Sequence, residues 1–107
     1  MGRKRVVEEK IFVEPSVVYF RLIEKGDVNG LKKLIEENSL NINELRTSAG
    51  NTGLMYAVHF KKKDVVRFLM NFGADTTLRN NHNETAVDIA KNDKELRDLR
   101  EKKRLFY

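Results

Sequence analysis

Apolar side chains recur three or four residues apart in two separated segments of the chain. The first segment contains Leu31, Leu34 and Ile35, and the second runs from Val65 to Phe72. This spacing places the apolar side chains on one face of an α-helix. Each segment is therefore predicted to be an amphipathic helix that buries this face.

A shorter helix and three helix ends are also predicted from local residue types. Ser16 is a candidate N-cap for a helix over Val17–Lys25, which Gly26 would end. Asn38 and Gly73 follow the two longer helices, and these residue types readily adopt the left-handed conformation that ends a helix. Polar, turn-rich stretches at 43–51 and 76–84 follow. The predicted order of elements is short helix, turn, longer helix and projecting loop.

Two parts of the sequence repeat at a nearly constant interval. Thr52–Ala57 and Thr85–Ala90 share the pattern Thr-small-apolar-x-apolar-Ala at an offset of 33 residues. Gly26–Ile35 parallels Lys61–Met70 at an offset of 35, so the first unit has a slightly longer connection. A period of about 33 residues indicates one supersecondary unit stacked on copies of itself.

These repeats resemble the ankyrin-repeat family over about residues 16–105. The residues that carry the resemblance are Gly26-Asp27, Asn51–Ala57, Asp64-Val65-Val66 with Leu69, Gly73-Ala74-Asp75 and Glu84–Ala90. The resemblance implies an all-α solenoid, an ankyrin-type stack of about three helix-turn-helix units with β-hairpin fingers.

The predicted domain organisation follows from this stack. Residues 1–15 form a basic extension that is expected to be flexible, 16–105 a single ankyrin-repeat domain, and 106–107 a tail. The units are placed at about 16–46, 47–79 and 80–105, as an N-terminal cap, one full repeat and a C-terminal cap. Three units are near the lower limit for a stable stack, so modest stability is expected.

The chain departs from the family pattern at several positions. The family's Thr-Pro-Leu-His motif has Pro where this sequence has Gly53 and Ala86, and His where it has Met55 and Asp88. Lys61 takes the place of the usual turn glycine between the two helices of the middle unit.

Composition excludes several classes of function. The chain has no cysteine, which excludes disulfides and thiolate chemistry, and no apolar run long enough to span a membrane. His59 and His82 belong to no metal-binding pattern, and no nucleophile motif or phosphate loop is present. A non-enzymatic chain without cofactor or metal, located in the cytoplasm or nucleus, is expected.

The positive charge is concentrated at the two ends. Of the net charge of +5, residues 1–10 contribute +2 and residues 91–107 contribute +3. Solvated surface is the simpler interpretation, and association with nucleic acid through these ends is the alternative function. Lys103-Arg104-Leu105-Phe106 also resembles a short docking peptide that cyclins recognise, while packing against the last unit is the simpler reading.

The resemblance further implies that the fingers and the exposed side of each first helix line a concave surface that binds other proteins. The chain is therefore predicted to be a protein–protein interaction module, an adaptor or regulator, that acts as a monomer. The residues predicted to contact the partner are Arg46, Ser48, Asn51, Met55, His59, Phe60, Arg79, Asn81, His82 and Glu84.

Two of these residues have a structural alternative. Met55 and Phe60 could instead pack against the neighbouring unit. Tyr56 is expected in or near the core, with its hydroxyl at a polar edge.

Overall fold

The computed structural model of this 107-residue chain describes residues 14–91, 93 and 96. Within these residues the secondary structure is helical, with one isolated antiparallel bridge between Arg46 and Thr52. The helices are α2 (Pro15–Lys25), α3 (Val28–Asn38), α4 (Gly53–His59), α5 (Lys63–Asn71) and α6 (Ala86–Ala90).

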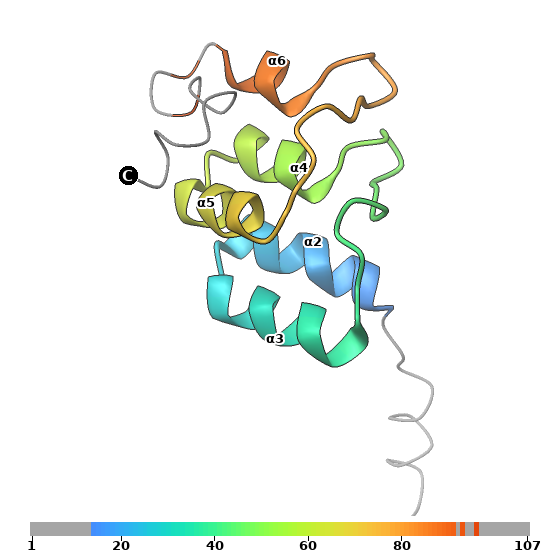
Figure 1. Ribbon diagram of the computed structural model, residues 1–107, viewed down its shortest axis with the longest axis vertical. Helices are drawn as coiled ribbons and strands as arrows, with labels where there is room; N and C mark the ends of the chain where they lie inside the picture. The colour runs from blue at the N-terminus through green and yellow to red at the C-terminus, as the bar shows by residue number, and fades with distance from the viewer. Residues whose placement is uncertain (1–13, 92, 94–95, 97–107) are drawn as a thin grey trace, which may run out of the picture.

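The helices form two layers, as Figure 1 shows. Helices α2, α4 and α6 follow one another in the first layer, because α4 packs against both α2 and α6. Helices α3 and α5 form the second layer, and each also packs against its own partner in the first layer. The two long loops project from the same side of the stack (Figure 1). The predicted all-α, ankyrin-type stack is confirmed.

The 33-residue repeat corresponds to two equivalent helix starts. Thr52 and Thr85 are the N-caps of α4 and α6, and their Oγ1 atoms accept hydrogen bonds from the backbone N–H groups of Met55 and Asp88. In return, Met55 Sδ and Asp88 Oδ2 accept from the backbone N–H groups of the two threonines. Met55 and Asp88 hold the position of the family's histidine, and each completes a capping box there.

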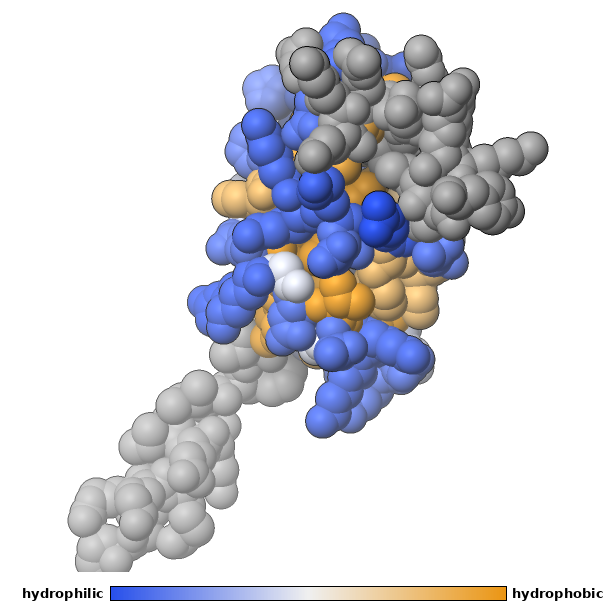
Figure 2. Space-filling model, turned by 90° about the vertical axis from the view of Figure 1, so that its left-hand side faces the viewer, coloured by the Kyte–Doolittle hydropathy of each residue, from blue (hydrophilic) through white to orange (hydrophobic). Residues whose placement is uncertain are grey.

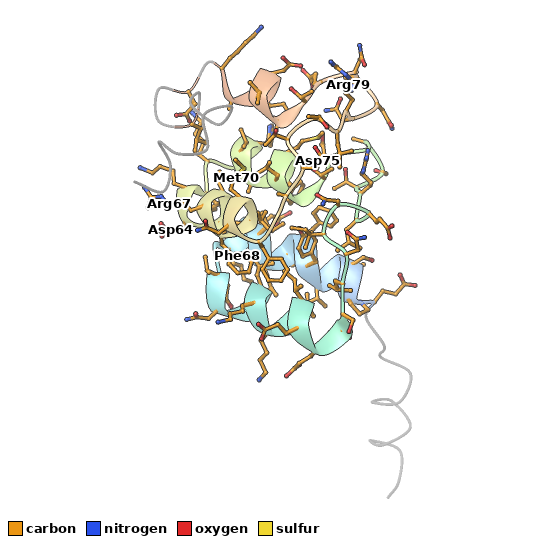
Figure 3. The ribbon with its side chains drawn as sticks, in the orientation of Figure 1. Asp64, Arg67, Phe68, Met70, Asp75 and Arg79 are labelled. Atoms are coloured by element: carbon orange, nitrogen blue, oxygen red, sulfur yellow. The ribbon has the colours of Figure 1, made fainter. Side chains whose placement is uncertain are left out.

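The core runs through all the helices in one connected cluster. Tyr19 and Ile23 of α2, Leu31 of α3, and Val65 and Leu69 of α5 are fully buried. Leu96, from the predicted C-terminal cap, is also buried at 1% exposure. Figure 3 shows Phe68 in the space between α5 and α3 and Met70 between α5 and α4. The apolar faces predicted for α3 and α5 are therefore the faces that pack, except that Phe72 follows the end of α5 and is 42% exposed.

The structure corrects two predicted helix ends. Helix α2 begins at Pro15, inside the predicted extension, with Glu14 as its N-cap and Ser16 in its first turn. Proline suits this position because the first helical N–H has no partner within the helix. Helix α3 extends through Asn38, and Ser39 takes the left-handed conformation with φ 52°. The predicted ends at Gly26 and Gly73 are confirmed, with φ of 75° and 101°.

Several predicted segments lie outside the described residues. They are residues 1–13 of the N-terminal extension, most of the charged helix expected over 94–104, and the apolar end 105–107. The unit bounds 16–46, 47–79 and 80–105 stay a prediction.

Candidate functional site

The two projecting loops have the same backbone design. In the first, the N–H of Thr47 donates to the carbonyl of Asn51 at 2.9 Å, and in the second the N–H of Asn80 donates to the carbonyl of Glu84 at 2.9 Å. We call 47–51 the first finger and 80–84 the second finger. Their hairpin character is limited to these tight turns and to the one bridge beside the first finger.

A side-chain network joins the two fingers to each other. Nη1 of Arg46 donates to the carbonyl oxygens of Gly50 at 3.2 Å and Arg79 at 3.0 Å. Asn81 binds the first finger twice, through its backbone N–H to the carbonyl of Ala49 and through Nδ2 to the carbonyl of Ser48. The fingers are thus connected directly to each other.

A groove with a volume of about 440 Å³ lies beside the connected fingers. We call it the finger groove. It is lined by Ala49 and Asn51 of the first finger, Asn80, His82 and Glu84 of the second, Met55 and His59 of α4, and Asp88 and Ile89 of α6. Two stretches of the chain that are separate in sequence, 49–59 and 80–89, therefore shape one concave site.

The acidic side chains of the groove are held in place by polar neighbours. Nδ2 of Asn80 donates to Glu84 Oε1 at 3.0 Å, and the backbone N–H of Thr85 donates to Asp88 Oδ2 at 3.0 Å. The hydrogen bond from Thr85 lowers the pKa of Asp88, and Arg79, with Nη1 4.0 Å from Oδ2, lowers it further. Asp88 thus stays ionised at neutral pH.

A row of aromatic rings continues from the groove across α4 to α2. Phe60 contacts His59 edge-to-face with centroids 5.2 Å apart, and Tyr56 contacts Phe60 at 4.9 Å and Phe20 at 5.1 Å. Phe60 is 41% exposed, so it presents apolar surface to solvent. Phe60 is thus exposed while also stacking on its neighbours.

Tyr56 behaves as expected. Its ring is half-buried, and its hydroxyl donates a hydrogen bond to Glu24 of α2. This hydrogen bond raises the pKa of Tyr56 above its ordinary value, because ionisation would break it.

The groove contains half of the predicted contact residues. Asn51, Met55, His59, His82 and Glu84 line it. Met55 is nevertheless only 1% exposed and serves as the acceptor in the cap of α4, which supports the packing alternative for Met55. Its contact with a partner stays a prediction.

The other predicted residues on the fingers carry structural hydrogen bonds. Arg46 and Asn81 connect the two fingers, and Nη1 of Arg79 donates to the carbonyl of Asn83 at 2.9 Å. Arg79 is still 55% exposed, at the edge of the groove, and Figure 3 shows it on the finger side of the stack. Ser48 is exposed near the tip of the first finger. Contact of these residues with a partner stays a prediction.

Sequence reasoning missed Asn80, Asp88 and Ile89. The repeat itself contained the signal for Asp88, which follows Met55 by 33 residues, but not for Ile89, because its equivalent Tyr56 is expected in the core. Asn80 could not be found in this way, since its Oδ1 accepts from the N–H groups of His82 and Glu84 in a turn that only the folded loop shows.

The opposite side of the stack carries the turns between the helices. A smaller recess of about 210 Å³ is found there, lined by Gly26 and residues 61–65. Figure 2 views this side, and hydrophilic side chains cover most of its described part around a central hydrophobic region. Residues 61–63 of this recess are all lysine. A run of lysines in a turn is typical of solvated surface.

The described residues contain no group of three or more His, Cys, Asp or Glu side chains arranged to hold a metal ion. His59, His82, Glu84 and Asp88 therefore share one groove without converging on a point. None of the helices in the described part is both long and apolar enough to cross a membrane.

Stacked helix pairs with projecting fingers define a repeat protein of the solenoid class. Residues 34–90 match the model of a family described as ankyrin repeats (many copies). The chain belongs to the ankyrin-repeat family. Ankyrin repeats are in general protein–protein interaction modules and not enzymes.

Two similar proteins come from different sources. An ankyrin repeat protein of Acanthamoeba polyphaga mimivirus is 33% identical over 89 residues, which are 81% of this chain and 12% of the viral protein. An ankyrin repeat protein of Rickettsia bellii is 31% identical over 85 residues, 76% of this chain and 48% of the bacterial protein. The chain thus spans less than half the length of either relative.

Solved structures share the fold. The ankyrin repeat domain of Bcl-3, described as a unique member of the IkappaB protein family, superposes with a TM-score of 0.68 at 24% identity, over 78% of this chain and 35% of that one. A chain in the complex of the predatory endopeptidase Bd0816 from Bdellovibrio bacteriovorus with the immunity protein Bd3460 gives 0.62 at 28% identity, over 82% of this chain and 44% of that one.

Proposed function

We propose that this chain is a non-catalytic interaction module that binds a protein partner on its finger face. The finger face comprises the finger groove and the adjoining exposed ring of Phe60. The observation that carries the proposal is the groove itself, which is formed by two fingers connected by hydrogen bonds and by the helices that follow them. A surface held in this way loses little conformational entropy when a partner binds.

The chemistry of the finger face supports recognition of a protein. It combines an exposed aromatic ring, two histidines, two carboxylates and the amide groups of Asn51 and Asn80. Aromatic anchors surrounded by polar groups are typical of protein interfaces. Because the stack is short, we expect a footprint at the small end of specific interfaces, roughly 1,200 Å² in total.

The proposal includes a regulatory or adaptor role in the cytoplasm or nucleus, with the chain acting as a monomer. The likeness to a chain in the complex that contains an immunity protein supports binding of a protein partner. Light scattering tests the oligomeric state, and a mass that rises with concentration would contradict the monomer.

A matched pair of phenylalanines tests the assigned face. Phe60 and Phe72 are 41% and 42% exposed, and each ring contacts the aromatic ring one helical turn before it. Phe72, however, lies at the end of α5, in the other layer. Phe60→Glu should abolish capture of protein partners from a lysate, while Phe72→Glu should retain it. Circular dichroism of both variants shows whether the fold is kept.

The same experiment tests the alternative function. The basic segments at the two ends, on which nucleic-acid association would depend, lie mainly outside the described residues. Capture that disappears with nuclease and is unaffected by Phe60→Glu would assign binding to the ends. If Phe72→Glu lost the protein partners while Phe60→Glu retained them, the finger face would be the wrong assignment for the binding surface.

A further inference from the structure

We propose that the finger groove receives a lysine or arginine side chain from a basic segment of the partner. This inference rests on the proposed function of the finger face and adds the chemistry of what binds there.

The charge of the groove is opposite to that of the chain. Lysine and arginine outnumber aspartate and glutamate by 21 to 16 in the whole sequence. The residues that line the groove include Glu84 and Asp88 and no lysine or arginine. Arg79 pairs with Asp88 from the edge of the groove, which leaves Glu84 as the carboxylate without a described cation beside it. A basic segment is therefore attracted to this site although the protein as a whole would repel it, which favours recognition of this one location.

The two carboxylates have oxygen atoms available for a partner. Asn80 donates to Oε1 of Glu84, while Thr85 donates to Oδ2 of Asp88, the same atom that lies 4.0 Å from Arg79 Nη1. Within the described part of the chain, no residue donates to the remaining oxygen of either side chain. Ammonium and guanidinium groups provide the donors that such oxygens accept.

The remaining lining suits the rest of a long basic side chain. Ala49 and Ile89 provide accessible apolar surface in the groove, where the aliphatic stem of lysine or arginine can pack. His59 continues into the exposed ring of Phe60, whose face can attract a cation that passes over it. Apolar surface next to free carboxylate oxygens matches a side chain with an apolar stem and a positive tip.

Other ligands fit the groove less well. Phosphate or a nucleic-acid backbone would bring negative charge against Glu84 and Asp88. A metal ion lacks a converging set of ligands among the described residues. The groove therefore favours a basic peptide segment over these alternatives.

Selection of peptides from a random library tests the inference without knowledge of the natural partner. The full chain is used to select from a phage-displayed library of random dodecapeptides, and the strongest binders are synthesised. Enrichment of lysine and arginine is expected in the selected peptides. When a selected peptide is added, the NMR chemical shifts of the protein's backbone amides should change mainly at the finger groove. Phe60→Glu should weaken binding of the peptide.

Isosteric variants then isolate the effect of charge. Glu84→Gln with Asp88→Asn keeps an acceptor oxygen for Asn80 and for Thr85, so the second finger and the cap of α6 should be retained. We expect this double variant to bind the selected peptide about tenfold more weakly. Glu36→Gln with Glu37→Gln removes the same charge from exposed positions of α3 and should leave binding unchanged.

The outcomes separate the two proposals. Peptides that bind the groove without basic residues, or equally well to the Glu84→Gln/Asp88→Asn variant, would overturn the charge inference and leave the finger face as the binding site. Failure of every selected peptide to perturb the groove would overturn both proposals. A peptide of residues 97–107 that binds the groove as tightly as the selected peptides would reassign it to this chain's own basic end.

Discussion

Gly53 begins α4 without a side chain because the ring of Tyr19 already fills the space beside it. A Cβ atom placed on Gly53 would contact the hydroxyl of Tyr19 and lie 2.6 Å from its Cζ. Tyr19 is completely buried, and no hydrogen-bond partner of its hydroxyl is found in the described part of the chain. This burial raises the pKa of Tyr19. The ring from the preceding unit thus explains why the family's proline is absent here.

Gly53→Ala should destabilise the protein by about 2 kcal/mol, because the added methyl group overlaps the ring of Tyr19. Helix propensity alone would favour alanine by up to ~1 kcal/mol, so the sign of the change separates the two effects. Urea denaturation measures the difference. In a Tyr19→Leu background the same substitution should cost close to nothing, and equal costs in both backgrounds would show that the clash is not the cause.

The turns between paired helices contain a second matched pair of residues. Gly26 and Lys61 occupy equivalent turns with φ of 75° and 59°, a conformation that is unfavourable for residues with a Cβ atom. Lys61→Gly should therefore raise the free energy of unfolding by about 1 kcal/mol, and Gly26→Ala should lower it by a similar amount. A Cβ on Gly26 would have room, at 3.6 Å from Cδ of Lys62, so backbone strain is the cause being measured. Stabilisation by both substitutions, or by neither, would contradict this explanation.

At the scale of elements, the sequence predicted the helices better than the fingers. The helices follow from apolar spacing and from the threonine caps at a 33-residue interval, which are local and periodic signals. The predicted start of α2 was wrong because Glu14 caps the helix without a side-chain hydrogen bond. The sequence therefore contains no typical N-cap residue at this position.

The roles of the finger residues could not be predicted in this way. An arginine at the position of Arg46 can reach a partner or a carbonyl of the next finger, and only the folded loops decide between them. The sequence therefore indicated the face that we propose for binding, while the structure separated Met55, which is buried, from exposed neighbours such as His59 and Phe60.

Arg46→Ala should loosen the fingers while leaving the helices intact. The substitution removes the two hydrogen bonds from Nη1, including the one to the carbonyl of Arg79, which directly precedes the second finger. We expect the amide of Asn81, which donates to Ala49, to exchange with solvent roughly tenfold faster, equivalent to about 1.4 kcal/mol of local stability. Ser48→Ala is the control at an exposed position of the first finger. Unchanged exchange at Asn81 would show that Arg46 does not hold the fingers together.

At the scale of the whole molecule, each helix pair depends on its neighbours for burial. Helix α4 is central, because it packs against α2, α5 and α6. Helix α6 is the shortest of these helices, with five residues. In a linear stack of this kind, stability is close to a sum of unit and interface terms. A stack of about three units therefore has few interfaces from which to gain stability.

Thermal unfolding should accordingly have a midpoint below ~80 °C. Differential scanning calorimetry of the full chain measures this midpoint. A higher value would indicate that the short stack gains stability from interactions that the described residues do not show.

Photo-crosslinking from two positions tests most directly whether the finger face binds a protein. Benzoylphenylalanine is placed at His82, in the finger groove, or at Lys33, an exposed position of α3 in the second layer. After illumination in a lysate treated with nuclease, position 82 should form a discrete adduct with a protein and position 33 should not. An adduct from position 33 alone, or the same adduct from both positions, would contradict binding at the finger face.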